Sequence, residues 1–152
     1  MIPEGSKAPD FESPSTGGTF RLRDAIEAGP LVLFFYPQAS TPGCTNEAVE
    51  FEAWYDRFEE IGVHIAGCSV DTLQDQSAFS AKHGGFRYPL IADSSADIGK
   101  AYGVYRDDWQ LTGRATAVIG EDGTVIKTYP KAPLHGKGHA EEVFTDVQRL
   151  GS

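Results

Sequence analysis

Apolar and polar positions follow strand-like and helix-like patterns in turn along the chain. Residues 31–36 form a continuous apolar run of strand length, Leu-Val-Leu-Phe-Phe-Tyr. Apolar residues that do not alternate along a strand are typical of a central strand covered on both faces. After this run, apolar side chains recur at the spacing of one helical face, namely at Cys44, Ala48, Phe51, Tyr55 and Phe58. The spacing predicts a helix that continues until Gly62.

The later part of the chain continues this succession of elements. We expect a helix capped at residue 71 or 72 that runs to about residue 83, two further helices over 97–102 and 139–150, and strands over 63–70, 88–92, 115–119 and 124–129. Glu121-Asp122-Gly123 is a strong hairpin signal between the last two strands. Residues 1–19 are rich in Gly, Pro and Ser. They are expected to form an irregular lead-in with a turn at Gly17-Gly18, followed by a short strand or helical turn over 20–26.

This order of elements predicts an α/β fold in which helices flank a central mixed β-sheet. The early crossovers should be parallel and right-handed, and the hairpin adds antiparallel strands. A thioredoxin-like fold fits this order, although other α/β sheets fit it as well. With 152 residues, of which 40% are hydrophobic, the chain is long enough for one domain over residues 1–152 with a substantial core.

Charge and hydropathy exclude several classes of partner. The net charge is −9 and the sequence has no cluster of basic residues, so neither nucleic acid nor an anionic membrane is expected as a partner. The longest apolar run, 31–36, is too short to span a bilayer. The first residues, MIPEGSKAPDF, are polar and lack the apolar region of a signal peptide. We therefore expect a cytoplasmic protein.

The two cysteines, Cys44 and Cys68, offer neither a disulfide framework nor a metal site by their spacing. The chain contains no Cys-x-x-Cys, and its four histidines form no ligand spacing with the cysteines. We expect no metal and no cofactor. Either cysteine is also compatible with a buried structural role, as is common for free cysteines.

The position of Cys44 favours chemistry. Thr41 is a good N-cap, Pro42 suits the first helical position, and Gly43 allows a close backbone approach. Cys44 then falls in the first helical turn. Unpaired N–H groups and the positive end of the helix dipole favour a thiolate over a thiol there. The alternative is that Thr-Pro-Gly is only a strand-to-helix turn and Cys44 a small core residue.

The pattern Pro37-x-x-x-Thr41-x-x-Cys44 after an apolar strand resembles the active-site signature of peroxiredoxins. Together with Gly43, Thr45 and Glu47 it is most similar to the bacterioferritin-comigratory-protein (peroxiredoxin Q) subfamily. The similarity extends over nearly the whole chain, through Ala8-Pro9-Asp10-Phe11, Gly67-Cys68-Ser69-Val70-Asp71, Tyr88-Pro89-Leu90-Ile91-Ala92-Asp93, Tyr102-Gly103-Val104 and Arg114-Ala115-Thr116-Ala117-Val118-Ile119 with Asp122-Gly123.

The resemblance implies a thiol-dependent peroxidase for hydrogen peroxide and organic hydroperoxides, in which the Cys44 thiolate becomes a sulfenic acid. Thr41, the amides of Gly43 and Cys44, and Arg114 are expected to stabilise the sulfur and the departing oxygen. Pro37 is expected to shield the pocket from water, and Glu47 to orient Arg114.

One position departs from this family. Many peroxiredoxin Q proteins carry a resolving cysteine five residues after the reactive one, where this chain has Val49. The leading interpretation is a one-cysteine enzyme, recycled by a thioredoxin-like, glutaredoxin-like or small thiol. The alternative is a two-cysteine peroxidase in which Cys68, inside a predicted strand, resolves the sulfenic acid.

Two other functions fit the same fold. A peroxide-sensing redox protein would oxidise Cys44 once and pass the signal to a partner. A thiol–disulfide oxidoreductase of the thioredoxin kind is disfavoured by the absence of Cys-x-x-Cys. The sequence leaves the choice between a monomer and a homodimer open. Trp109 is expected to line a pocket or an interface.

Overall fold

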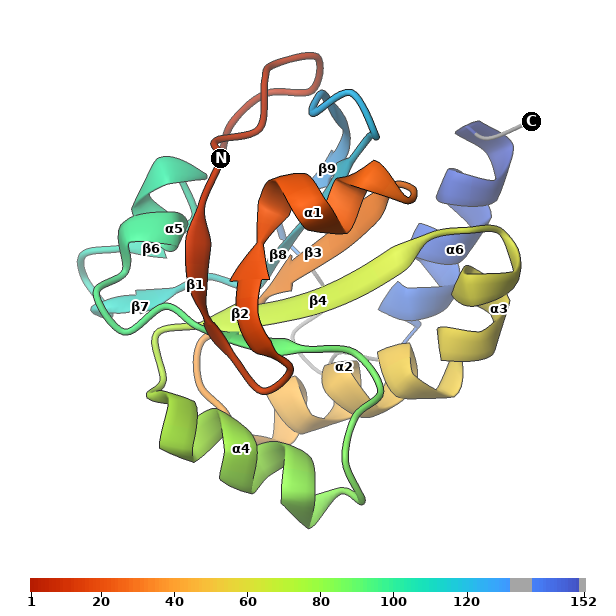
Figure 1. Ribbon diagram of the computed structural model, residues 1–152. Helices are drawn as coiled ribbons and strands as arrows, with labels where there is room; N and C mark the ends of the chain where they lie inside the picture. Colours follow the sequence, from red (N-terminus) through yellow and green to blue (C-terminus); the bar gives the residue numbers. More distant parts are fainter. Residues whose placement is uncertain (132–137, 151–152) are drawn as a thin grey trace.

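A seven-stranded mixed sheet forms the centre of the computed structural model, which describes residues 1–131 and 138–150 (Figure 1). The strands lie in the order β2-β1-β5-β4-β3-β8-β9. β3, β4 and β5 run parallel, whereas β8, β9, β1 and β2 are joined by antiparallel pairing. The mixed sheet expected from the order of elements is thus confirmed.

The strands of this sheet are β1 (Glu12–Ser15), β2 (Gly18–Arg21), β3 (Leu31–Phe35), β4 (His64–Ser69), β5 (Leu90–Ala92), β8 (Ala115–Ile119) and β9 (Val125–Tyr129). The helices are α1 (Leu22–Glu27), α2 (Pro42–Ala53), α3 (Tyr55–Glu60), α4 (Leu73–Lys82), α5 (Asp97–Ala101) and α6 (His139–Leu150). A separate two-stranded sheet, β6 (Tyr105–Arg106) and β7 (Leu111–Thr112), lies beside α5 (Figure 1).

The central strand β3 is fully buried because both faces of the sheet are covered. Val32 and Phe34 pack on one face against α2, α3, α4 and α6, which we call the α2 face. Leu31, Leu33 and Phe35 pack on the other face against α1 and α5, which we call the α1 face. Successive residues of a strand point to opposite faces, so a continuous apolar run is what a strand between two cores requires.

The predicted helix through Gly62 is interrupted. The backbone of Trp54 (φ −95°, ψ 0°) separates α2 from α3. This bend lets the rings of both Trp54 and Phe58 pack against Phe144 of α6, each at a centroid distance of 5.3 Å. Tertiary packing thus divides a segment that its periodicity alone presents as one helix.

The expectation of an irregular lead-in over residues 1–19 is confirmed for residues 1–11, which contain no helix or strand, and is wrong for residues 12–19. β1 and β2 form an antiparallel hairpin in which Ser15 pairs with Gly18, and β1 also pairs with β5. The inward-facing residues of β1 are Ser13 and Ser15. The Ser13 hydroxyl donates to the Ala92 carbonyl at 3.0 Å. Because the buried side chains here are polar, hydropathy gives no strand signal.

Within residues 1–131 and 138–150, no helix is long and apolar enough to cross a bilayer. This agrees with the absence of a long apolar run in the sequence.

Candidate active site

Cys44 lies where the buried strand β3 passes into α2. Pro42 is the first residue of α2, and Thr41 takes the extended N-cap conformation (φ −82°, ψ 153°). The helix start is therefore where the sequence predicts it. The Cys44 side chain is only 1% exposed and belongs to the core of the α2 face.

Thr41 occupies the N-cap position but its side chain does not cap the helix. The hydroxyl donates to the Gln38 carbonyl at 2.9 Å and accepts no helical N–H. The predicted side-chain cap is therefore wrong, because the preceding loop supplies a carbonyl within reach. The helix start is held instead by the Thr45 N–H, which donates to the Thr41 carbonyl at 2.8 Å.

Arg114 reaches the Cys44 sulfur from a distant part of the sequence. β8 pairs antiparallel with β3, and Ala115 lies opposite Phe35. This register places the residue before β8 at the end of β3, next to the start of α2. The Arg114 Nη2 atom donates to Cys44 Sγ at 3.3 Å. A guanidinium in contact with the sulfur stabilises its anionic form.

Glu47 lies one helical turn beyond Cys44 and is also buried, with 1% of its side chain exposed. Its Oε1 atom is 3.5 Å from Arg114 Nη1. Neither carboxyl oxygen of Glu47, nor Nη1 of Arg114, has a hydrogen-bond partner in the part of the chain that the structure describes. Burial raises the pKa of Glu47 to about 8, although the charge of Arg114 acts in the opposite direction. At neutral pH the carboxyl group thus holds its proton, and the guanidinium charge remains available to the sulfur.

The remaining predicted site residues, Pro37 and Gly43, lie in the loop before α2 and in the first turn of α2. Gly43 is half-buried in the first turn of α2, where helices leave N–H groups without helical partners. Pro37 is half-buried and, together with Arg114, lines a pocket of about 640 Å³. Trp109 lies in the wall of the same pocket with 48% of its surface exposed. The prediction that Trp109 walls a pocket or an interface is confirmed for the pocket.

A second group of polar residues holds the loop before α2, and sequence reasoning missed it. The Ala39 N–H and the Ser69 hydroxyl both donate to Asp71 Oδ2, at 2.8 and 2.6 Å. Gln76 of α4 donates to Ser69 at 2.8 Å and accepts from the Tyr36 hydroxyl at 2.6 Å. Ser69-Val70-Asp71, at the carboxyl end of a buried strand, was the available signal. Polar residues at the carboxyl ends of parallel strands meet at one edge of the sheet.

Cys68 points away from this site. It lies in β4 opposite Phe35 of β3, and its side chain packs in the core of the α1 face. Cys44 packs in the core of the α2 face. Burial raises the pKa of the Cys68 thiol well above its ordinary value. Both cysteines are free thiols in this structure, and the sheet lies between them.

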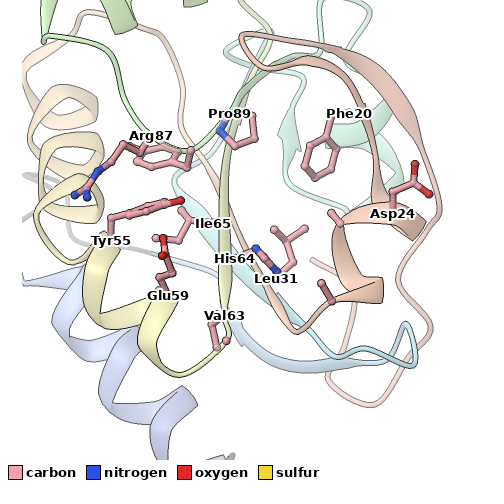
Figure 2. Close-up of a pocket in the computed structure, with 14 residues that line it drawn as sticks. Phe20, Asp24, Leu31, Tyr55, Glu59, Val63, His64, Ile65, Arg87 and Pro89 are labelled. Atoms are coloured by element: carbon pink, nitrogen blue, oxygen red, sulfur yellow. The ribbon is translucent and has the colours of Figure 1, made fainter.

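Another pocket, of about 360 Å³, lies at the opposite end of the parallel strands. It is lined by Leu31, the first residue of β3, and by Val63 and His64 at the start of β4. Figure 2 shows Tyr55 and Arg87 on one side of it and Phe20 and Asp24 on the other. The Arg87 guanidinium forms ion pairs with Glu52 and Asp56. Since Cys44 follows the carboxyl end of β3, this pocket is remote from the sulfur.

Comparisons with known proteins agree with this geometry. The model of the AhpC/TSA family matches residues 5–128. A putative peroxiredoxin of Mycobacterium tuberculosis is 41% identical over 155 residues, covering 97% of each chain. Peroxiredoxin Bcp of Xanthomonas campestris is 33% identical over 139 residues, covering 88% of this chain and 85% of that protein.

Solved structures show the same similarity. The crystal structure of peroxidoxin BcpB from Mycobacterium tuberculosis superposes with a TM-score of 0.90 at 32% identity and covers 100% of both chains. Xylella fastidiosa PrxQ superposes with a TM-score of 0.90 at 28% identity, over 100% of this chain and 99% of that one. The chain therefore belongs to the AhpC/TSA family, within its Bcp and peroxiredoxin Q branch, and is a thiol-dependent peroxidase with a thioredoxin-like fold.

Proposed function

We propose that Cys44 is the nucleophile of this peroxidase and that Arg114 is its electrostatic partner. The observation that carries the proposal is the 3.3 Å contact between Arg114 Nη2 and Cys44 Sγ, made by residues 70 positions apart. A largely enclosed guanidinium in contact with a buried sulfur stabilises negative charge on that sulfur. Cys44 also lies in the first turn of α2, where the helix dipole acts in the same direction.

In the proposed reaction the Cys44 thiolate attacks one oxygen of a hydroperoxide. A sulfur–oxygen bond forms, the O–O bond breaks, and the departing oxygen takes up a proton to leave as water or an alcohol. The sulfur is oxidised to a sulfenic acid and the peroxide is reduced. Negative charge develops on the departing oxygen, so donors that are already oriented toward it lower the barrier most.

The donors we assign to this oxygen are Arg114, the amides of Gly43 and Cys44, and the Thr41 hydroxyl. Thr41 would exchange its bond to the Gln38 carbonyl for one to the peroxide. Pro37 lines the pocket beside Arg114 and would keep bulk water from the sulfur. We assign Glu47 to the orientation of Arg114, since its buried carboxyl group faces that guanidinium at 3.5 Å.

We further propose that Cys44 works without a resolving cysteine. Cys68 packs on the opposite face of the sheet, and a disulfide needs the two Cα atoms within about 7 Å with Cβ atoms directed toward each other. The high pKa of the Cys68 thiol also disfavours it as an attacking thiolate. An external thiol would therefore reduce the sulfenic acid.

Two variants test this assignment. Cys44→Ser should abolish catalytic consumption of hydrogen peroxide in the presence of a thiol supply, and Cys68→Ala should largely retain it. Alanine is chosen at residue 68 because a serine hydroxyl would be buried without an assigned partner. Equal loss in both variants would refute the one-cysteine assignment. A single stoichiometric oxidation of the wild-type protein, without turnover, would favour a peroxide sensor instead.

We also propose that residues 1–152 act as one domain, in the cytoplasm, as a monomer or a homodimer. The seven-stranded sheet supports the first point, because it joins β1 near one end of the chain to β9 near the other. Sedimentation of the purified protein would separate the two oligomeric states.

A further inference from the structure

We propose that the pocket beside Arg114 binds a small thiol that carries a carboxylate, and that this thiol is the reductant of oxidised Cys44. This inference rests on the proposed function. The pocket, which we call the Arg114 pocket, has a volume of about 640 Å³ and is lined among others by Pro37, Arg106, Trp109, Arg114 and Lys131. Its volume is within the range of sites for small organic ligands.

The burial of Cys44 determines how large a reductant can be. The sulfur lies in contact with Arg114, and only 1% of the residue is exposed. A cysteine on the surface of a partner protein reaches such a sulfur only if the first turn of α2 opens. A small thiol can instead bind in the pocket against Arg114, the residue that contacts the sulfur. Cys44 itself does not line the pocket, so the thiol reaches the sulfur only when the Arg114 side chain moves. The geometry therefore favours a small molecule over a protein thiol.

The charge of the pocket selects an anion. The whole sequence has 22 acidic and 13 basic residues, yet none of the described residues that line this pocket is Asp or Glu, and three are basic. Arg106 is paired with Asp108 at 2.8 Å, and Arg114 contacts Glu47 and Cys44.

Lys131, the third basic residue that lines the pocket, takes part in neither of these pairings. Its ammonium group has no ion-pair partner within residues 1–131 and 138–150. An exposed lysine at the pocket margin can therefore take a carboxylate of the ligand, while the cationic surroundings also favour the thiolate form that attacks.

Trp109 adds an aromatic surface to the same pocket. The Arg106 guanidinium lies 3.8 Å from the centre of the Trp109 ring. This contact fixes one face of the indole. The hairpin that carries Trp109 is fixed at its base, because the Thr112 hydroxyl donates to the Tyr36 carbonyl at 2.7 Å. Trp109 thus presents a fixed aromatic surface on which the carbon skeleton of a small thiol can pack.

The chemistry balances with two molecules of this thiol. The first thiolate attacks Cys44 Sγ, an S–S bond forms, the S–O bond breaks, and the hydroxide leaves as water after taking up a proton. A second thiolate attacks the sulfur of the bound thiol, which releases the Cys44 thiolate and a small-molecule disulfide. The two thiols lose two electrons in total, and the sulfenic acid gains them.

The test separates the two half-reactions. The protein is first oxidised by one equivalent of hydrogen peroxide and then mixed with 3-mercaptopropionate, 2-mercaptoethanol or cysteamine, which are anionic, neutral and cationic. For each thiol, the rate at which it reduces oxidised Cys44 is measured in wild type, in Lys131→Glu and in the control Lys7→Glu. Lys7 is exposed and pairs through its backbone with Thr124, at the far end of β8 and β9.

Lys131→Glu should lower the rate at which 3-mercaptopropionate reduces oxidised Cys44 by about twofold to fivefold, the size of an exposed ion pair. It should raise the rate with cysteamine, leave 2-mercaptoethanol unchanged, and leave the oxidation by hydrogen peroxide unchanged. Lys7→Glu should match wild type with all three thiols. Added salt should reduce the preference for the anion.

Three results would overturn the inference. The first is an equal effect of Lys131→Glu on all three thiols, and the second is no effect at all. The third is an effect confined to the oxidation of Cys44 by hydrogen peroxide, which would assign Lys131 to the peroxide step. Failure of hydrogen peroxide to oxidise Cys44 would instead refute the proposed function itself, so the two failures are distinguishable.

Discussion

Arg114 lies between two groups that compete for its charge, the Cys44 sulfur at 3.3 Å and the Glu47 carboxyl group at 3.5 Å. A fully ionised Glu47 would neutralise much of the guanidinium charge. Burial raises the pKa of Glu47 to about 8, so near neutral pH the carboxyl group is mostly protonated. The arrangement therefore directs the positive charge of Arg114 to the sulfur.

Replacement of Arg114 tests this directly. Arg114→Gln should lower the rate constant for oxidation of Cys44 by hydrogen peroxide by about 100-fold or more, the size found when one oriented donor to a developing oxyanion is removed. The rate can be followed by competition with a peroxidase of known rate. Arg23→Gln, a change at an arginine with 83% side-chain exposure, should leave it unaltered. An unchanged rate in Arg114→Gln would exclude Arg114 from the chemistry.

Glu47 should make stability decrease with rising pH. Its pKa is raised from 4.5 to about 8 in the folded protein, so the folded state holds a proton that the unfolded state has lost. The free energy of unfolding should thus fall, relative to Glu47→Gln, by about 1.4 kcal/mol per pH unit across this window. Urea denaturation of both proteins across the window measures the difference. A difference that is constant with pH would show that Glu47 is ionised throughout.

Single residues differ in how well the sequence predicts them. Cys44, Thr41 and Glu47 lie on one short segment, so local spacing places them together. Arg114 could be paired with Cys44 only through a resemblance, because their contact depends on the β3–β8 register. The direction of the Thr41 hydroxyl depends on the fold of residues 37–41, which hydropathy does not encode.

At the level of elements, the start of α2 depends on the loop before it, and that loop is held by Asp71. Asp71 accepts from the Ala39 N–H and the Ser69 hydroxyl. Asp71→Ala should lower the free energy of unfolding by about 1–3 kcal/mol, because it removes two bonds to a charged acceptor. It should also slow the oxidation of Cys44. Glu121→Ala, at an exposed turn residue, provides the control. Unaltered oxidation in Asp71→Ala would show that the loop needs no such support.

The packing of α6 should be sensitive to acid through His139. Its ring is buried, with Nε2 2.8 Å from Thr116 Oγ1 and Nδ1 3.1 Å from Glu142 Oε1. Burial lowers the pKa of His139 below 6.5, against the opposing effect of Glu142 and Glu50 and with a contribution from Arg114. The unfolded state thus binds the proton more readily. Stability relative to His139→Gln should be full above pH 6.5 and decrease as the pH falls below it.

Thermal unfolding of both proteins between about pH 5 and 7.5 checks this. A parallel decrease in the two proteins would assign the acid sensitivity to other groups.

Elements were predictable where burial coincides with apolarity. β3, β4, β8 and α6 carry regular apolar patterns and form close to the expected residues. The β1–β2 hairpin buries Ser13 and Ser15, and β6–β7 spans too few residues for any period to be read. The bend at Trp54 arises from packing against α6, which is remote in sequence.

Across the whole molecule, the sheet separates the two cysteines. Cys44 packs on the α2 face and Cys68 on the α1 face. The alternation of side chains along β3 and β4 produces this separation, and a disulfide between them would require the sheet to be rearranged. The order of elements predicts the sheet, but the face on which each cysteine lies follows from strand register, which the sequence leaves open.

Mass spectrometry of the protein after one equivalent of hydrogen peroxide tests the central claim most directly. One oxygen should be added to Cys44, in a form that a sulfenic-acid reagent captures, while Cys68 stays a free thiol. Loss of two hydrogens with a peptide joining Cys44 to Cys68 would contradict the account, as would oxidation that falls first on Cys68.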